Sequence, residues 1–316
     1  MSTNPVILCP GQGAQHAGMG RTWSGASLAW MQTMQAADEF LGDRLGVRLM
    51  DMCMSEHDDR IHRTDIAQPA LLAVGVASFR GAFGEMTADQ IGAAAGLSLG
   101  EYTALHLADA ISFHDALDLV AIRGRAMQDA AEATKGGMIA IVGAEEPAVA
   151  ELCEKAAGGD PLTLANFNAP GQIVISGAAA ACDRAEKIAA EMGLRWSRLA
   201  VAGAFHSALM APAADTLRAA LARVEIREPR CTVMSNATGG PHGADLEPGE
   251  SVADSIRRRL VDQLTASVRW VQNCQWLIAH HPEAPYHEVA PGKVLTGLMR
   301  RIDKNTKVQS HAEPQA

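Results

Sequence analysis

The segment AAAGLSLGEYTAL, residues 93–105, places a single serine, Ser98, between two glycines. Residues 91–95 are apolar and predict a buried strand, and residues 99–110 have the composition of a helix. In a G-x-S-x-G turn between a strand and a helix, the serine hydroxyl projects above the sheet and the next N–H faces the reacting carbonyl. The chain has 29 glycines, so the pentapeptide can arise by chance, and its placement carries the prediction of a nucleophile.

A serine hydroxyl needs a neighbouring base, and 11 histidines compete for that role. His206 is the strongest candidate, because the segment 201–207 (VAGAFHS) follows the last strand of a compact unit and faces a predicted cleft. A buried structural histidine is the alternative interpretation. No Asp or Glu stands out as the third member of a catalytic triad. A Ser–His dyad, with the imidazole oriented by a main-chain carbonyl, is therefore an alternative to a triad. Histidines in polar or Gly-rich stretches are interpreted as solvated: His57, His62 and His242.

The compact unit begins near Met138 and alternates strands with helices. Its order is βαββαβ, which is typical of a ferredoxin-like fold. The strands are predicted at 138–142, 162–166, 172–176 and 195–201, and the helices at 145–157 and 178–192. We therefore expect a ferredoxin-like small subdomain at residues 135–200, inserted into a large α/β-hydrolase-like domain with a parallel sheet, residues 1–134 and 201–316. A polar tail is expected from Asp303.

The length of 316 residues suffices for one large domain with an insertion or for two domains. A net charge of −9 and few aromatic residues (4%) argue against a nucleic-acid or anionic-membrane partner. Six cysteines without a CxxC pair are typical of reduced thiols, and no apolar run reaches about 18 residues. These features, with no leader-like N-terminal segment, predict a cytoplasmic protein.

A metal centre is not expected from the histidine-rich stretch near the C-terminus. His280, His281 and His287 lack a helical i, i+4 pair and are separated by prolines, so we interpret them as a solvated loop.

Taken together, the motifs resemble those of the malonyl-CoA:acyl-carrier-protein transacylases and the acyltransferases of polyketide synthases. They occur in the family's order over residues 5–302. The matching stretches are PGQGAQ (10–15), QPAL (68–71), GLSLGEY (96–102), RGRAMQ (123–128), NFNAPGQ (166–172), AFHS (204–207) and VAPGKVLTG (289–297).

The resemblance implies that Ser98 carries the acyl group and that His206 is its base, held by the main-chain carbonyl of Gln263. It implies an oxyanion hole made by the main-chain N–H groups of Gln12 and Leu99. The rival interpretation of the Gly11-Gln12-Gly13 loop is a dinucleotide fingerprint, which would need glycine at position 16, where the chain has histidine.

The resemblance also implies that Arg123 forms a bidentate salt bridge with the malonyl carboxylate, a task that suits a planar guanidinium. From composition alone, Arg123 would be a solvated helix residue. Phe205 would leave little room for an α-substituent, and Gln68 and Asn168 would complete the pocket. The implied partners are malonyl-CoA and an acyl carrier protein, with no cofactor and no metal.

Two positions depart from the pattern. Leu97 stands where many relatives have histidine, so we expect an altered rate or altered hydrolysis rather than loss of activity. The Gly/Pro-rich loop 237–249 is longer than in compact relatives, which affects the placement of Gln263. For an acidic carrier protein, the expected docking patch is basic: Arg257, Arg258, Arg259, Arg300, Arg301, Lys304 and Lys307.

The sequence leaves three alternatives open. An editing acyl hydrolase has the same fold, but such relatives usually lack the arginine at position 123. A polyketide acyltransferase acting in trans shares every motif named above. A non-catalytic carrier-protein binding partner would not need intact Ser98, His206 and Gln12.

Overall fold

The computed structural model describes residues 4–315, and its larger sheet has five parallel strands in the order β7-β2-β1-β8-β9. Strands β1 and β2 are fully buried four-residue runs, as expected where helices cover both faces of a parallel sheet. The strands are β1 (Val6–Cys9), β2 (Ala93–Gly96), β7 (Thr232–Val233), β8 (Tyr286–Glu288) and β9 (Val308–Ser310). The predicted parallel sheet is confirmed.

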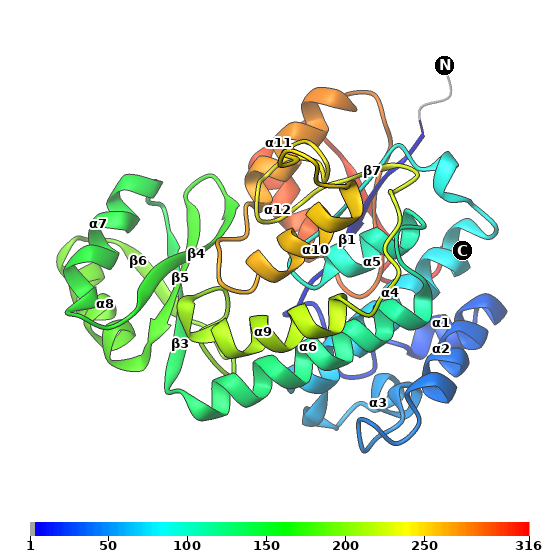
Figure 1. The fold of residues 1–316 in the computed structure, drawn as a ribbon, viewed down its shortest axis with the longest axis horizontal. Helices are drawn as coiled ribbons and strands as arrows, with labels where there is room; N and C mark the ends of the chain where they lie inside the picture. The colour runs from blue at the N-terminus through cyan, green and yellow to red at the C-terminus, as the bar shows by residue number, and fades with distance from the viewer. Residues whose placement is uncertain (1–3, 316) are drawn as a thin grey trace.

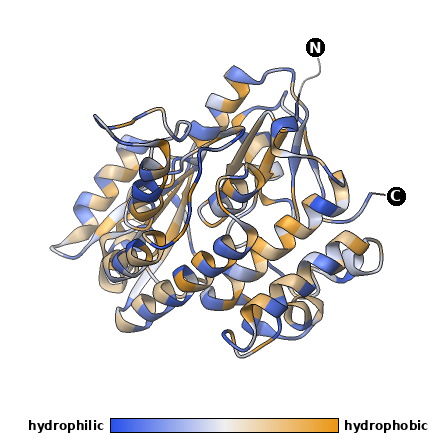
Figure 2. Cartoon of the chain, turned by 45° about the vertical axis from the view of Figure 1, so that its right-hand side comes forward, coloured by the Kyte–Doolittle hydropathy of each residue, from blue (hydrophilic) through white to orange (hydrophobic). Residues whose placement is uncertain are grey.

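Helices surround this sheet, and those on the outside carry both hydrophilic and hydrophobic residues (Figure 2). They are α1 (Arg21–Ser24), α2 (Leu28–Leu41), α3 (Leu49–Met54), α4 (Thr64–Phe83), α5 (Gly100–Leu107), α6 (Phe113–Ala133), α9 (Ala211–Leu221), α10 (Val252–Asp262), α11 (Trp270–His280) and α12 (Val294–Ile302). Short 3-10 turns occur at Asp59–His62, Ala88–Gln90 and Ala208–Met210.

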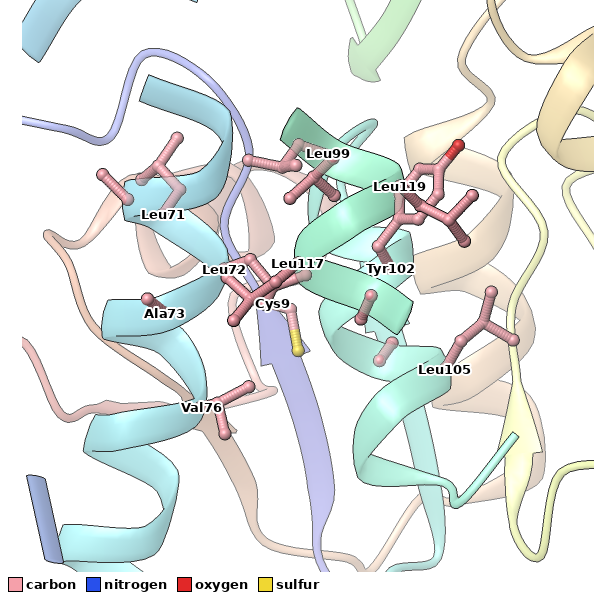
Figure 3. Packing of buried hydrophobic residues seen from close by; sticks show 14 of the residues in the cluster. Cys9, Leu71, Leu72, Ala73, Val76, Leu99, Tyr102, Leu105, Leu117 and Leu119 are labelled. Atoms are coloured by element: carbon pink, nitrogen blue, oxygen red, sulfur yellow. The ribbon is translucent and has the colours of Figure 1, made fainter. Parts of the chain in front are cut away.

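The centre of the core lies between β1 and the helices α4, α5 and α6. Figure 3 shows Leu72 and Val76 of α4 beside Cys9 of β1, with Leu117 of α6 close by. Helix α4 is the one helix within residues 4–315 that is long and apolar enough to cross a membrane, but 78% of its most apolar window is buried by the protein. It is therefore a core helix.

The smaller sheet is antiparallel, with strand order β4-β5-β3-β6. Its elements are β3 (Gly136–Val142), α7 (Glu146–Ala157), β4 (Leu162–Ala169), β5 (Gln172–Ala178), α8 (Ala179–Glu191) and β6 (Arg195–Arg198), and they form one end of the molecule (Figure 1). This order and pairing confirm the ferredoxin-like unit. Where the subdomain boundary falls remains a prediction.

One expectation about the elements was wrong, and one strand was not predicted. The predicted strand 195–201 ends at Arg198, and its residues are exposed because β6 is the edge strand of the small sheet. The polar tail is not purely irregular, because Val308–Ser310 pairs in parallel with β8 as an edge strand of the large sheet. A strand of three residues is too short to be recognised from its sequence pattern.

Main-chain hydrogen bonds join the small sheet to the large domain. Val268, just before α11, accepts a hydrogen bond from Phe167 N–H (2.9 Å) and donates one to the carbonyl of Ala165 (2.8 Å). This contact fixes β4 against the large domain and places Asn166 and Asn168 near the nucleophile turn, with which they line one cavity. A cleft therefore forms where the small unit faces that turn.

Candidate active site

Ser98 lies at the turn between β2 and α5, in the left-handed backbone region with φ +52°. A non-glycine residue rarely adopts this conformation, which costs on the order of 1–3 kcal/mol and is held only by surrounding contacts. The bend is possible because Gly100 has no side chain: a Cβ there would stand 2.0 Å from the Cys9 carbonyl oxygen. The predicted strand–turn–helix arrangement is therefore present.

His206 is the histidine that meets this serine. The Ser98 Oγ and His206 Nε2 atoms are 2.9 Å apart, and the His206 Nδ1 lies 2.7 Å from the main-chain oxygen of Gln263. Because a carbonyl can only accept, Nδ1 carries the proton and Nε2 is left free to accept the serine hydroxyl. The structure thus places Ser98, His206 and Gln263 in the geometry that the resemblance implied.

The imidazole of His206 is buried, and burial together with the nearby Arg123 cation lowers its pKa to about 4. The bond to the Gln263 carbonyl opposes this shift. The ring is therefore neutral at neutral pH, which is the state a general base needs.

Arg123, on α6, is 1% exposed, so the interpretation as a solvated helix residue is wrong. Its guanidinium donates to Gln68 Oε1 (2.7 Å), Gln263 Oε1 (2.9 Å) and Ser98 Oγ (3.0 Å). All three acceptors are neutral, and Arg123 Nε is buried without a partner among residues 4–315. Burial lowers the pKa of this guanidinium, since an isolated cation is costly away from water. The site therefore holds a cation whose hydrogen-bond partners carry no negative charge.

Two main-chain N–H groups are available for an oxyanion. In the described part of the chain, neither Gln12 N–H nor Leu99 N–H meets an acceptor. The loop carrying Gln12 can approach the turn closely because Gly11 has no side chain. A Cβ on Gly11 would stand 2.1 Å from the Leu97 carbonyl oxygen, so only glycine fits. The Gln12 side chain is anchored by a bond from its Nε2 to Thr64 Oγ1 (3.1 Å).

A cavity of about 610 Å³ opens onto this group. Ser98, Arg123 and His206 line it, and so do Phe205 and Asn168, as expected. Gln68 does not: it is fully buried behind Arg123, so its placement in the pocket wall was wrong. The lining also includes Leu97 and the polar side chains Gln15, His62 and Asn166.

Two histidine interpretations were wrong, because segments distant in the sequence determine the surroundings. His242 is not solvated: its side chain is fully buried and its Nε2 lies 2.8 Å from Glu101 Oε1. His280 and His287 are not in a loop, since His280 is the last residue of α11 and His287 belongs to strand β8, where it contacts His311 at 3.0 Å. His62 is exposed as expected, but it also lines the active cavity. No local sequence signal distinguishes these histidines from one another.

The expected docking patch divides into two parts. Arg257, Arg258 and Arg259 are partly buried and each contacts an acidic side chain: Asp254, Glu250 and Asp245, respectively. They are neutralised within the chain. The other four basic residues line a hollow with Pro170: Arg300, Arg301, Lys304 and Lys307.

Within the described range 4–315, no group of three His, Cys, Asp or Glu side chains is arranged to hold a metal ion. A larger hollow of about 860 Å³ lies away from Ser98, between α6 and α9, and three arginines line it. Arg63 and Arg125 contact Asp65, and Arg44 contacts Asp118, so their charges are paired within the chain.

A serine and a neutral histidine at the carboxyl end of a parallel sheet, beside a cavity with a buried cation, define an acyl-transferring α/β protein. Residues 6–302 match the acyl transferase domain family, and the chain belongs to that family. It is 36% identical to the malonyl CoA-acyl carrier protein transacylase of Escherichia coli strain K12 over 315 residues, 99% of this chain and 97% of that one.

Solved structures agree with this assignment. The malonyl-CoA:acyl carrier protein transacylase of Xanthomonas oryzae pv. oryzae is 39% identical, with a TM-score of 0.89 over 99% of this chain and 96% of that chain. A malonyl-transacylase in complex with a type II polyketide synthase acyl-carrier protein is 34% identical, with a TM-score of 0.86 over 98% and 96% of the two chains.

Proposed function

We propose that the protein is a malonyl-CoA:acyl-carrier-protein S-malonyltransferase that works through a malonyl-O-Ser98 intermediate. The observation that carries this is Arg123, a buried cation 3.0 Å from Ser98 Oγ whose hydrogen-bond partners are neutral. An acyl group that ends in a carboxylate supplies the missing anion, and a guanidinium binds a carboxylate through two parallel donors. An acetyl group would leave the cation unpaired.

The first half-reaction loads the serine. Ser98 Oγ attacks the thioester carbonyl while its proton moves to His206 Nε2, and the developing oxyanion meets the N–H groups of Gln12 and Leu99. The C–S bond then breaks, and the proton on His206 passes to the departing CoA thiolate. The second half-reaction is the reverse, with the pantetheine thiol of the carrier protein as nucleophile. Exchange of two thiols at one serine requires ping-pong kinetics and no further cofactor.

Intact-mass spectrometry tests the loading step after brief incubation with malonyl-CoA or acetyl-CoA. We expect a malonyl adduct on the wild type, none on Ser98→Ala, and at least a tenfold lower yield on Arg123→Ala. Acetyl-CoA should load the wild type poorly, since it cannot pair with Arg123. Preferential acetyl loading, or release of free malonate faster than transfer to a carrier thiol, would contradict the proposal and favour an editing hydrolase.

For the carrier protein, we propose docking at the basic hollow formed by Arg300, Arg301, Lys304 and Lys307. Pro170 also lines this hollow and is two residues from Asn168, which lines the active cavity. A partner bound there would lie close to a residue that lines the active cavity. Arg301→Glu should lower kcat/KM for the carrier protein about tenfold and leave malonyl-CoA loading unchanged.

Lys187→Glu, an exposed charge reversal on α8, is the control for the docking test and should have little effect on either half-reaction. An equal loss in both half-reactions of Arg301→Glu would remove the docking assignment.

The relatives include enzymes of fatty-acid and of polyketide pathways, and the pathway of this chain is not assigned. Its cytoplasmic location remains a prediction.

A further inference from the structure

Behind the serine and its base lies a buried pair that the transfer reaction does not use directly. Glu101 is in the first turn of α5, is 0% exposed, and contacts the equally buried side chain of His242. His242 comes from the long loop 237–249, far along the chain. A carboxylate and an imidazole are costly to bury, so their placement next to the nucleophile turn calls for a role.

The other carboxylate oxygen of Glu101 connects to both sides of the site. Glu101 Oε2 accepts hydrogen bonds from Gln263 Nε2 (2.8 Å) and from the main-chain N–H of Asn236 (3.0 Å). With His242 on Oε1 at 2.8 Å, the carboxylate has three partners from two distant segments. It therefore fixes Gln263 and Asn236 relative to α5.

Asn236 and Gln263 in turn hold the strained serine at both of its peptide groups. Asn236 Oδ1 accepts from Ser98 N–H (2.6 Å), and Asn236 Nδ2 donates to the Gly96 carbonyl (2.6 Å). Gln263 Nε2 also donates to the Ser98 carbonyl (3.0 Å). The unfavourable φ of Ser98 is thus maintained by two residues that share one carboxylate.

Gln263 carries two further functional groups. Its main-chain oxygen orients His206, and its side-chain Oε1 accepts from Arg123. A shift of Gln263 would therefore move the base and the cation together. Glu101 is not among the described residues that line the active cavity, so its contacts reach the reacting groups through these neighbours.

We propose that Glu101, held by His242, is a positioning residue that sets the alignment of Ser98 and His206 for nucleophilic attack. The inference deepens the proposed function, and rests on it, by assigning a determinant of its rate. Misplacement of reacting groups by about 1 Å can cost a factor of about 100. The loss should appear in the rate of serine acylation, and the KM for malonyl-CoA should rise as well, because Gln263 also holds Arg123.

The variants separate the effect of the position of Glu101 from the effects of its charge and of protein stability. Glu101→Gln keeps the shape and one acceptor, whereas Glu101→Ala removes all three contacts. His242→Gln keeps an N–H donor close to the position of imidazole Nε2, whereas His242→Leu does not. Exposed residues provide matched controls: Glu146→Ala in the first turn of α7, and His57→Ala.

The rate of Ser98 modification is measured on each folded variant with two probes, malonyl-CoA and a fluorophosphonate, and the final modified fraction is determined by intact mass. We expect full final modification in every variant. The rates should be about 100-fold lower for Glu101→Ala, about tenfold lower for Glu101→Gln and His242→Leu, and near wild type for His242→Gln and both controls. Unfolding in guanidinium chloride verifies that each variant is folded.

Wild-type rates with a reduced final fraction in Glu101→Gln and His242→Leu would show a purely structural role and overturn the inference. The inference also fails if His242→Gln is as slow as His242→Leu. The fluorophosphonate keeps this test separate from the substrate assignment. If it modifies Ser98 in the wild type and malonyl-CoA does not, the malonyl proposal fails while the positioning inference is still decided by the fluorophosphonate rates.

Discussion

The charge of His206, the proposed base, is controlled first by burial and then by the neighbouring Arg123. Both act against the imidazolium, which lowers the pKa to about 4. Malonyl binding would neutralise Arg123 and remove the second cause. The cation that we propose to bind the malonyl carboxylate therefore also helps burial to keep His206 unprotonated in the free enzyme.

This residue-scale coupling predicts the pH dependence of kcat/KM for malonyl-CoA. Because the base is active only when neutral, activity should be retained as the pH falls through 6.5 and decline near pH 4. Arg123→Leu removes the repulsion between the guanidinium and the imidazolium. The acid limb of the pH profile should therefore move to higher pH, but stay below 6.5 because His206 remains buried. Steady-state rates between about pH 4 and pH 8 on both proteins measure this. An unchanged limb in the variant would contradict the coupling.

At the scale of elements, the nucleophile turn depends on close approach between β1, β2 and α5. A Cβ on Gly100 would lie 2.0 Å from the main-chain oxygen of Cys9, and backbone cannot move aside as a flexible side chain can. The position is therefore restricted by packing at the strand end. Gly297 in α12 differs, because a Cβ there would meet nothing within 4 Å.

These two glycines predict opposite effects of one substitution. Gly100→Ala should destabilise the protein by about 3 kcal/mol through overpacking and abolish serine acylation. Gly297→Ala should be neutral or stabilise by up to about 1 kcal/mol, since alanine favours a helix. Guanidinium unfolding of both variants gives the comparison, and equal stabilities would argue against the close approach.

At the scale of the whole molecule, three histidines shielded from water make the fold sensitive to mild acid. Burial lowers the pKa of His106, His206 and His311 to about 4 in each case. The unfolded chain binds these protons already near pH 6.5, so between 6.5 and 4 it holds more protons than the folded protein. The free energy of unfolding should therefore be fully present above about pH 6.5 and fall as the pH drops toward about 4.

Guanidinium unfolding at about pH 7.5 and about pH 4.5 measures this loss, which can reach about 3 kcal/mol for each fully buried imidazole. Carboxylates contribute in a lower window: Arg258 lowers the pKa of Glu250 to about 2, so that pair weakens only below about pH 4.5. His106→Asn should show a smaller difference between the two pH values than the wild type. A difference of the same size would mean that His106 does not contribute.

The sequence by itself determined the nucleophile turn, the βαββαβ unit and the family, because each is encoded by contiguous residues: glycines around Ser98, alternating periodicity after Met138, and short motifs in order. It also pointed to His206 and Arg123, the latter only through the motif. The tertiary structure decided what depends on residues far apart in the chain. It buried Arg123 among neutral partners, moved Gln68 behind it, neutralised the three arginines at 257–259, and joined Glu101 to His242 across 141 positions. The physical reason is that burial and charge pairing arise from packing between distant segments, which no local pattern records.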